Sequence, residues 1–283
     1  MIRRVNEDLS APGKADRQRF AREGYIDIHC HCLPAVDDGP TTKHEALALC
    51  QLLVDDGITT VIATPHQLGR FNGRNQAAGV RESVSMFNKE LETHRIPLTV
   101  VPGGDVRLDE RICRLLETDK ILTLADGGRY ILLELPSEVF IDIEPLLVEL
   151  ARLDVQVIIS HPERNSVLIR QSGALLKWLS RSAHLQVTAG SLLGEFGSMA
   201  QRAAWRFLSL GWASFVATDC HNSSSRRPQM KAVFKSISKK LGQATARWVC
   251  IENPLRVLKG QDVLRRLAAS TRMCTNETAP NNF

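Results

Sequence analysis

From Tyr25 onward, short runs rich in aliphatic and β-branched residues alternate with longer amphipathic stretches. The candidate strands are YIDI (25–28), TTVIA (59–63), LTVV (98–101), YILLE (130–134), VQVIIS (155–160), LQVTA (185–189) and ASFVAT (213–218). Helix-like segments between them include HEALALCQLLVDDG (44–57), RESVSMFNKELETH (81–94), IEPLLVELARLD (143–154) and MAQRAAWRFLSLG (199–211). Because strands joined through helices run parallel, the alternation predicts an α/β protein.

Parallel strands of this kind form either an open doubly wound sheet or a closed barrel. An open sheet commonly begins with a glycine-rich phosphate loop after its first strand, but neither GxGxxG nor GxxxxGK[ST] occurs there. Seven candidate strands in 283 residues favour a barrel. Without an internal repeat or low-complexity linker, we predict one domain at 24–263, an N-terminal extension at 1–23 and a C-terminal tail at 264–283.

Composition and charge indicate the compartment and exclude some partners. No apolar run approaches the roughly 18 to 20 residues of a membrane span, and the N-terminus lacks the apolar block of a secretory signal. Seven cysteines without regular spacing indicate free thiols. These features predict a cytoplasmic protein without membrane insertion. The formal charge of +5 is weak evidence by itself, so we expect no nucleic-acid partner, and we interpret the basic stretch 223–240 as a helix with a solvated face.

The first chemical motif, YIDIHCHCLPAVDDG, places His29 and His31 directly after the first strand. Residues two apart in extended backbone point to the same side, so both imidazoles can reach one site while Cys30 and Cys32 point away. This spacing suits a metal pair, although paired histidines also occur as ordinary hydrogen-bonded residues. A Cys-x-Cys zinc site is the alternative, but the sequence has no second cysteine pair at a suitable spacing.

Polar residues recur at the C-terminal ends of the later strands. They are His66 after TTVIATP, Asp105 after LTVVPGG, Glu134 in YILLE, His161 after VQVIIS, and Asp219 and His221 after ASFVAT. In a parallel barrel these ends lie on one face, where catalytic residues are found. The other three histidines, His44, His94 and His184, are interpreted as surface or core residues.

The donor set combines imidazole with carboxylate, which suits Mn²⁺, Fe²⁺ or Zn²⁺. It is too large for one ion, and carboxylates can bridge neighbouring ions that together clamp a phosphoryl group. The pattern therefore predicts a multinuclear metal-dependent hydrolase.

Several longer motifs resemble those of a known family when they are taken together. They are YIDIHCHCLPAVDDGP, VIATPH, ILLELP, IISHPERN, TAGSLLGEFG, ATDCHNSSSRRP and ENPLRVLKG. The chain resembles the PHP (polymerase and histidinol phosphatase) superfamily from Tyr25 to about Val263. Within it, the chain is most similar to bacterial manganese-dependent protein-tyrosine phosphatases of capsule and exopolysaccharide clusters. The resemblance implies a distorted TIM-like (β/α)7 barrel whose C-terminal face holds two or three ions, mainly Mn²⁺, with Fe²⁺ or Zn²⁺ as alternatives.

The resemblance also implies individual residue roles. The implied metal ligands are His29, His31, Asp38, His66, Asp105, Glu134, His161, Asp219 and His221. Asp38 follows from the likeness of VDDG, since the strand-end argument does not separate it from Asp37. The implied phosphate-binding arginines are Arg164 and Arg226, with Arg227 as the adjacent alternative. Family members usually carry glutamate in a PGxE stretch, where this chain has the shorter Asp105, so the number of bound ions depends on this residue.

The implied reaction is hydrolysis of phosphotyrosine on a protein, with the tail of a bacterial tyrosine kinase that controls capsule or exopolysaccharide synthesis as the expected substrate. A phenolate, with a parent pKa of about 10, leaves more readily than a serine alkoxide. Cys220 is expected to point away from the site, since Asp219 and His221 flank it. Three alternatives stay open: a phosphatase of a small phosphomonoester such as histidinol phosphate, an amidohydrolase-like metalloenzyme, and a non-catalytic metal-binding regulator. The sequence does not indicate an oligomeric state.

Overall fold

The computed structural model describes residues 24–137 and 139–265, and its centre consists of parallel strands. The strands are β1 (Tyr25–Cys30), β2 (Ile58–Ala63), β3 (His66–Gln67), β4 (Thr99–Pro102), β5 (Asp105–Arg107), β6 (Tyr130–Glu134), β7 (Gln156–Ser160), β8 (His184–Thr188) and β9 (Ala213–Ala217). Every described strand pairing is parallel. The predicted extension 1–23 and most of the predicted tail lie outside the described residues.

Two of the seven expected strands are each split into two pieces. β2 and β3 are separated by Thr64 and Pro65, and β4 and β5 by Gly103 and Gly104. Proline cannot donate to a strand ladder, which accounts for the first break. At the second, a Cβ on Gly104 would lie 2.2 Å from the Oε1 of Gln67, so any larger residue would have to displace that side chain. Counting each split strand once, the structure contains the seven predicted strands.

The strands follow one another in chain order around a barrel that is incompletely hydrogen-bonded. One sheet has the order β1-β2-β4, and the other has the order β3-β5-β6-β7-β8-β9. The barrel closes where β1 meets β9 and the segment after it, through an isolated bridge between Cys30 and Cys220 instead of a continuous ladder. We call this line of contact between β1 and β9 the seam. The predicted distorted α/β barrel is confirmed, with its distortion located at the two breaks and the seam.

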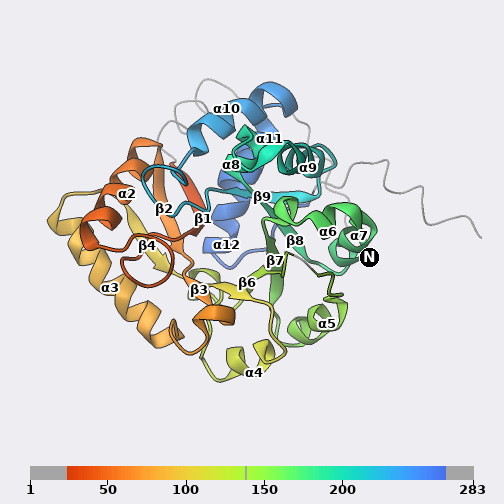
Figure 1. Ribbon diagram of the computed structural model, residues 1–283, viewed down its shortest axis with the longest axis horizontal. Helices are drawn as coiled ribbons and strands as arrows, with labels where there is room; N and C mark the ends of the chain where they lie inside the picture. The colour runs from red at the N-terminus through yellow and green to blue at the C-terminus, as the bar shows by residue number, and fades with distance from the viewer. Residues whose placement is uncertain (1–23, 138, 266–283) are drawn as a thin grey trace, which may run out of the picture.

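Helices surround the strands (Figure 1). The α-helices are α2 (Lys43–Asp55), α3 (Ala77–Thr93), α4 (Ile112–Glu117), α5 (Glu144–Arg152), α6 (Ser166–Arg170), α7 (Ser172–Ser180), α8 (Ala189–Leu193), α9 (Gly197–Ser209), α10 (Met230–Leu241), α11 (Gln243–Arg247) and α12 (Asn253–Leu258). Short 3₁₀ or π turns are η1 (Gly69–Phe71), η2 (Leu124–Asp126), η3 (Pro162–Arg164) and η4 (Trp248–Glu252). Among the described residues, no helix combines the length and apolarity that crossing a membrane requires.

The four expected helical segments correspond to α2, α3, α5 and α9, but the basic stretch 223–240 is only partly helical. Its helix, α10, begins at Met230. Before it, the side chain of Asn222 accepts the backbone N–H groups of Ser224, Ser225 and Arg226, which folds this segment into a turn. The expected helix over the whole stretch was therefore wrong at its N-terminal end, because a local side-chain bond competes with helix formation there.

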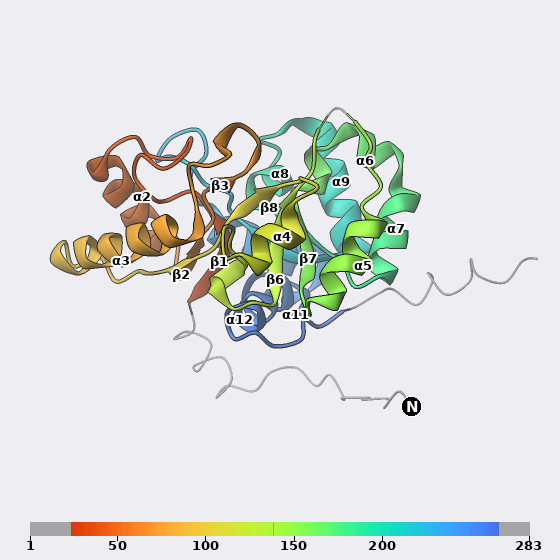
Figure 2. The ribbon, with the colours of Figure 1, turned by 90° about the horizontal axis from the view of Figure 1, so that it is seen from below.

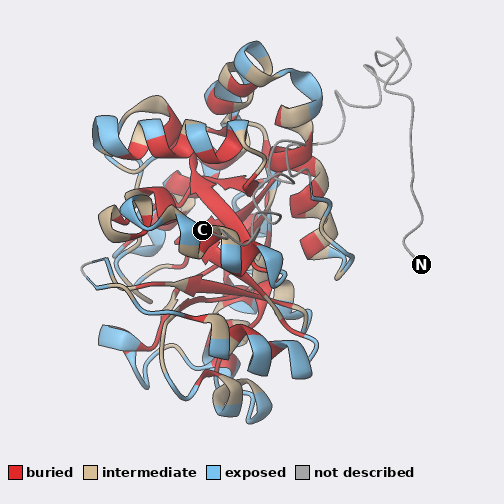
Figure 3. Cartoon of the chain, turned by 90° about the vertical axis from the view of Figure 1, so that its right-hand side faces the viewer, coloured by how far each residue is buried: buried red, intermediate tan, exposed pale blue. Residues whose placement is uncertain are grey.

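The core has two layers, and the strands in Figure 3 are buried while the surrounding helices are exposed on their outer sides. The larger layer lies between the strands and helices. The smaller fills the barrel and consists of Ile26, Ile28, Ile62, Leu124, Tyr130, Leu132, Ile158, Phe215, Ala217 and Val257. Val257 comes from α12, which lies below the strands in Figure 2. One end of the barrel is thus filled by apolar side chains, which leaves the other end for polar groups.

A bulge in β1 turns the two histidines toward that other end. Ile26 and Ile28 belong to the inner layer, whereas Cys30 belongs to the outer layer. Strict alternation would put all three on one side. The pairing steps from Asp27 to Cys30 on β1 while β2 advances only from Val61 to Ala63, so β1 carries one extra residue. An extra residue of this kind interrupts the alternation of side chains between the two sides of the strand. His29 can therefore follow the inward-facing Ile28 and still point into the cavity.

Candidate metal centre

All nine side chains that the sequence suggested as ligands lie together at the C-terminal ends of the strands. Within the described residues, their ligand atoms fall into four groups whose members lie within 4.8 Å of one another. The groups are His31, Asp38, His66 and His221; His29, Asp105 and His161; His29, His31 and Asp219; and His66, Asp105 and Glu134. Because the groups share His29, His31, His66 and Asp105, they form one continuous cluster.

One part of the cluster lies around the histidine pair. The Nε2 atoms of His29 and His31 are 3.2 Å apart, so one ion about 2.0–2.1 Å from each nitrogen can contact both. The Oδ1 atom of Asp219 lies 3.3 Å from the first nitrogen and 3.5 Å from the second. All three side chains are buried. Two imidazole nitrogens and a carboxylate oxygen therefore converge on one point.

A second part lies around Asp105, which is fully buried. Its Oδ2 atom is 3.3 Å from Nδ1 of His66 and 3.7 Å from Nε2 of His29. The Nδ1 atom of His66 also lies 3.8 Å from Oε2 of Glu134. The short aspartate thus reaches into two of the four groups, and its carboxylate occupies a position from which it can bridge two ions.

Asp38 occupies the outer edge of the cluster. Its Oδ1 atom lies 3.4 Å from Nε2 of His66 and 3.4 Å from Nε2 of His221. Its neighbour Asp37 instead accepts a hydrogen bond from Nδ1 of His31 at 2.6 Å and one from the backbone N–H of His66 at 3.0 Å. The structure therefore separates the two adjacent aspartates. Asp38 lies among the ligand atoms, and Asp37 orients two of the histidines.

Two further side chains, which the strand-end pattern did not indicate, orient the cluster. Gln186 Oε1 lies 3.0 Å from Nδ1 of His29. Asp27 accepts the backbone N–H of Thr218 at 3.0 Å and also its hydroxyl, which ties β1 to the segment that carries Asp219. Second-sphere partners of this kind fix the ring orientation of histidine ligands. The sequence shows them only as polar residues within otherwise apolar strands and does not indicate their partners.

Two cluster residues have left-handed backbone conformations although neither is glycine. His161 has φ 33° and Asp219 has φ 51°. Such conformations cost about 1–3 kcal/mol and are concentrated at functional sites. At Asp219 the turn also breaks the extended backbone that was expected around Cys220.

Cys220 nevertheless points away from the cavity. Its Sγ atom is fully buried and lies 3.4 Å from Sγ of Cys30. The expectation that the sequence contains no Cys-x₅-Arg segment, the spacing of a thiol-based tyrosine phosphatase, was wrong, because Cys220 and Arg226 have this spacing. Because the thiol faces the core, this spacing does not build a nucleophile. The six cysteines within the described range are free thiols.

The cluster opens into a cavity of about 530 Å³. Besides five of the candidate ligands, its walls include Leu68, Gly69, Arg70, Phe71, Arg107, Arg164 and Arg226. Arg164 Nη2 lies 2.7 Å, and Arg226 Nη2 lies 2.6 Å, from Oδ2 of Asp219. Arg227 is exposed and does not line the cavity. The structure therefore places both expected arginines beside the cluster and favours Arg226 over its neighbour.

The protonation states suit cation binding at most of these positions. Burial lowers the pKa of His31 to about 4 and lowers that of His161 well below its ordinary value, so both rings are neutral at pH 7. Burial opposes ionisation of Asp219, but His29 and the two arginines outweigh it and hold its pKa well below the usual range. Burial also opposes the charged form of His66, yet Asp105 and the other carboxylates raise its pKa to about 9, so His66 must release a proton to bind an ion.

Unsatisfied buried atoms test whether the cluster fits a metal. Among the described residues, both carboxylate oxygens of Asp105 and Nε2 of His221 are buried without a hydrogen-bond partner. Buried polar atoms are rarely left in this state, since each costs about 1–3 kcal/mol. A cation would satisfy all three, because each atom can present a lone pair. The donor set therefore fits divalent ions bound by nitrogen and oxygen.

Comparison with known proteins identifies relatives along most of the chain. The family model described as "Capsular polysaccharide synthesis, CpsB/CapC" matches residues 25–259. Tyrosine-protein phosphatase YwqE of Bacillus subtilis is 34% identical over 248 residues, which cover 85% of this chain and 94% of the relative. Tyrosine-protein phosphatase CpsB of Streptococcus pneumoniae is 26% identical, covering 83% of this chain and 99% of the relative.

Solved structures agree with this result. A chain from the crystal structures of YwqE from Bacillus subtilis and CpsB from Streptococcus pneumoniae, described as unique metal-dependent tyrosine phosphatases, matches with a TM-score of 0.81 and 33% identity. That match covers 85% of this chain and 97% of the other. The phosphotriesterase homology protein of Escherichia coli matches with a TM-score of 0.53 at 14% identity, over 82% of this chain and 97% of the other, and shares the fold.

Proposed function

Because the chain belongs to the CpsB/CapC family, and is on that evidence a metal-dependent tyrosine-protein phosphatase, we propose roles for the residues of its cavity. The nine clustered side chains bind two or three divalent ions, with Mn²⁺ as the main ion. Arg164 and Arg226 bind the phosphoryl group. The folded unit that carries this site spans residues 24–263, a boundary supported by the family match to residues 25–259.

The observation that carries the metal assignment is the convergence of nine imidazole and carboxylate groups with unsatisfied buried atoms among them. Mixed nitrogen and oxygen donors suit Mn²⁺, Fe²⁺ and Zn²⁺. The numerous carboxylates favour Mn²⁺ among these. Asp105 supports more than one ion, because its carboxylate belongs to two of the groups.

The two arginines contribute binding and charge. Each guanidinium contacts Asp219 and lines the cavity, so each can also face the oxygens of a phosphoryl group. A planar guanidinium matches phosphate oxygens with two parallel hydrogen bonds. The Arg164 guanidinium lies 4.6 Å from the ring centroid of Phe196, which limits its freedom before substrate binds. Bound divalent ions would supply positive charge at the phosphoryl oxygens and lower the pKa of water toward neutrality.

The substrate that we propose is a tyrosine-phosphorylated protein, and specifically the tail of a bacterial tyrosine kinase that controls capsule or exopolysaccharide synthesis. The family description supports the pathway, and the wide cavity supports a peptide. A phenolate leaving group also lowers the demand for a proton donor, since its parent pKa is about 10.

Metal analysis of the purified protein beside a substrate panel with added Mn²⁺, Fe²⁺ or Zn²⁺ tests these roles. The panel contains a phosphotyrosine peptide, a phosphoserine peptide and histidinol phosphate. We expect hydrolysis of the phosphotyrosine peptide that is strongest with Mn²⁺. His161→Ala and Asp219→Ala should lower turnover by about two orders of magnitude or more in a folded protein, and Arg164→Ala should raise KM with metal content unchanged.

Two results would contradict the assignment. Hydrolysis at the wild-type rate in all three variants would contradict the assignment of the active site. A much higher kcat/KM for histidinol phosphate than for the phosphotyrosine peptide would contradict the proposal that the substrate is a protein.

A further inference from the structure

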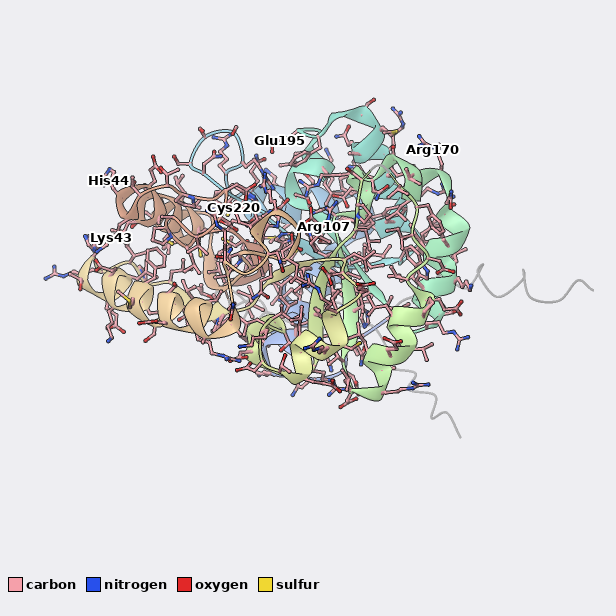
Figure 4. The ribbon with its side chains drawn as sticks, turned by 60° about the horizontal axis from the view of Figure 1, so that its bottom comes forward. Lys43, His44, Arg107, Arg170, Glu195 and Cys220 are labelled. Carbon is pink, nitrogen blue, oxygen red and sulfur yellow. The ribbon has the colours of Figure 1, made fainter. Side chains whose placement is uncertain are left out.

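One wall of the cavity has no role in the proposed phosphate chemistry. After the candidate ligands and the two phosphate-binding arginines are set aside, the remaining lining residues are Leu68–Phe71 and Arg107. We call these residues the arginine wall. It comes from the loop after β3 and from β5, and Figure 4 shows Arg107 near the middle of the molecule, between α2 and α3 on one side and α5 to α7 on the other.

The side chains of the arginine wall are packed against one another and against the metal cluster. The rings of Phe71 and His66 stack with centroids 5.6 Å apart and an interplanar angle of 13°. The guanidinium of Arg70 lies 4.8 Å from the centroid of Phe71. A Cβ on Gly69 would lie 3.1 Å from Cγ of Arg107, so the loop packs on the stem of that arginine. These contacts hold two cationic groups and an aromatic ring at the side of the cavity.

The charges of the arginine wall are all positive. Arg70 pairs with Asp38, and Nη1 of Arg107 lies 3.2 Å from Oε1 of Glu134. Both carboxylates are candidate metal ligands, and ions bound there would offset their charge. The side chains of Arg70 and Arg107 are 67% and 35% exposed, respectively, so a bound peptide can reach both. The arginine wall itself contains no acidic residue. In the metal-loaded protein it therefore presents two cationic side chains to a bound substrate.

We propose that Arg70 and Arg107 are specificity-determining residues that select phosphotyrosines with acidic residues beside them. The inference deepens the proposed function and rests on it. The phosphoryl group lies against Arg164 and Arg226, the substrate ring lies along Leu68 and Phe71, and neighbouring Asp or Glu side chains pair with the arginine wall. An exposed ion pair is worth up to about 1 kcal/mol, which corresponds to roughly a fivefold change in affinity for each arginine.

The test compares three phosphotyrosine peptides of one length whose flanking residues are Glu, Gln or Lys. p-Nitrophenyl phosphate is the substrate without flanks, and all assays use the Mn²⁺-loaded full-length protein. The variants are Arg70→Ala, Arg107→Ala and Arg107→Glu. Arg111→Ala is the matched control, because Arg111 pairs with Asp109 near the same segment but does not line the cavity.

We expect wild type to prefer the Glu peptide through a lower KM, and to lose this preference as ionic strength rises. Each alanine variant should raise KM for the Glu peptide about fivefold while kcat, and activity toward p-nitrophenyl phosphate, change less than twofold. Arg107→Glu should reverse the preference toward the Lys peptide. Arg111→Ala should behave as wild type.

Two outcomes would overturn the inference. One is a wild-type protein with equal KM for the three peptides. The other is an equal loss of activity on every substrate in the Arg70 and Arg107 variants, which would mean that these residues only position Asp38 and Glu134. Failure of the proposed metal centre would look different, since His161→Ala would then retain hydrolysis of p-nitrophenyl phosphate.

Discussion

The carboxylate of Asp37 contacts both His31 and the backbone of His66, yet it lies outside the candidate ligand set. Asp37→Asn removes its negative charge and one acceptor while it keeps the shape of the side chain. Because a partner of this kind fixes the orientation of the imidazole, we expect a 10- to 100-fold loss of metal affinity and of activity at limiting Mn²⁺. Metal titration followed by activity measures both quantities, and excess Mn²⁺ should restore part of the rate.

The exposed helix residue Asp55 supplies the control for this prediction, because Asp55→Asn makes the same chemical change far from the cluster. An Asp37→Asn protein with unchanged metal affinity would mean that His31 does not need this partner.

The buried thiol of Cys220 gives a second prediction. Cys220→Ser should retain at least half of the wild-type kcat with a phosphotyrosine peptide, because the thiol contacts Cys30 in the core and not the cavity. Complete loss of turnover in a folded variant, or a phosphocysteine trapped by rapid quenching, would contradict a metal-based mechanism.

His184 links stability to pH. It is buried between Ser214 and Gln156, and burial lowers its pKa to about 3 from an ordinary value near 6.5. Below pH 6.5 the unfolded chain therefore binds a proton that the folded protein excludes, and stability falls as the pH falls. Between pH 7.5 and pH 5, the free energy of unfolding of wild type should therefore fall by about 2 kcal/mol more than that of His184→Gln.

Urea unfolding at the two pH values measures this difference, with the exposed residue His94 changed to Gln as the control. Parallel pH profiles for wild type and His184→Gln would show that His184 does not contribute.

At the scale of residues, the sequence identified positions better than orientations. The strand-end rule located His66, His161 and Asp219 because the carboxyl ends of parallel strands meet on one face whatever the details of packing. Asp37, Gln186 and Asp27 could not be recognised, because their roles depend on which backbone or imidazole nitrogen lies beside them in space. The left-handed turn at Asp219 was likewise hidden, since only a few per cent of non-glycine residues adopt that conformation and no local pattern marks this one.

At the scale of elements, the break between β4 and β5 depends on glycine. A Cβ on Gly104 would collide with the side chain of Gln67, which cannot move freely because it donates to Asn75 O at 2.6 Å and accepts from the backbone N–H of Leu122 at 2.9 Å. Gly104→Ala should therefore lower the free energy of unfolding by about 1–3 kcal/mol. Chemical denaturation measures the change.

Gly79 offers a control of opposite sign. It lies in α3, is exposed, and a Cβ there would meet nothing within 4 Å. Gly79→Ala should raise the free energy of unfolding by up to about 1 kcal/mol, since alanine favours helix more than glycine does. A stable Gly104→Ala protein would mean that the Gln67 side chain can relocate.

The strands and the main helices were predictable because hydrophobic periodicity and helix boundaries are local signals. The bulge in β1 was not, because YIDIHC alternates as an ordinary strand would and the extra residue appears only against the pairing with β2. The helix expected from residue 223 failed for a local reason, since the Asn222 side chain captures three backbone N–H groups.

At the scale of the whole molecule, the candidate ligands come from β1, the ends of the intermediate strands and the segment after β9. Ions that bind them should therefore stabilise the entire barrel. At a free Mn²⁺ concentration about 100 times its dissociation constant, the expected gain is about 2.7 kcal/mol, or roughly 5–10 °C in Tm. Thermal scans of chelator-treated protein with and without Mn²⁺ measure the shift.

His161→Ala is the matched variant for that experiment, because it removes one ligand from one of the four groups. Its Mn²⁺-dependent shift should be smaller than that of wild type. An equal shift in both proteins would indicate that the ion binds elsewhere.

The barrel itself could be expected from seven strands separated by helices, but its manner of closing could not. Closure at the seam depends on one bridge between Cys30 and Cys220 and on the bonds from Asp27 to Thr218, contacts between residues almost 200 positions apart. No local pattern in the chain encodes such a pairing. A strand at the open edge of a sheet has the same sequence pattern as a strand that closes a barrel.

The seam can form only late in the synthesis of the chain. Its two sides are the first and the last strands of the barrel, so a ribosome releases one long before the other exists. A nascent chain that ends before β9 already carries every candidate ligand except Asp219 and His221, so His29 and His31 lack the carboxylate that the segment after β9 supplies. The group of His29, His31 and Asp219 can therefore form only after the end of the barrel has been synthesised, and a chain terminated before β9 keeps the histidine pair without its carboxylate partner.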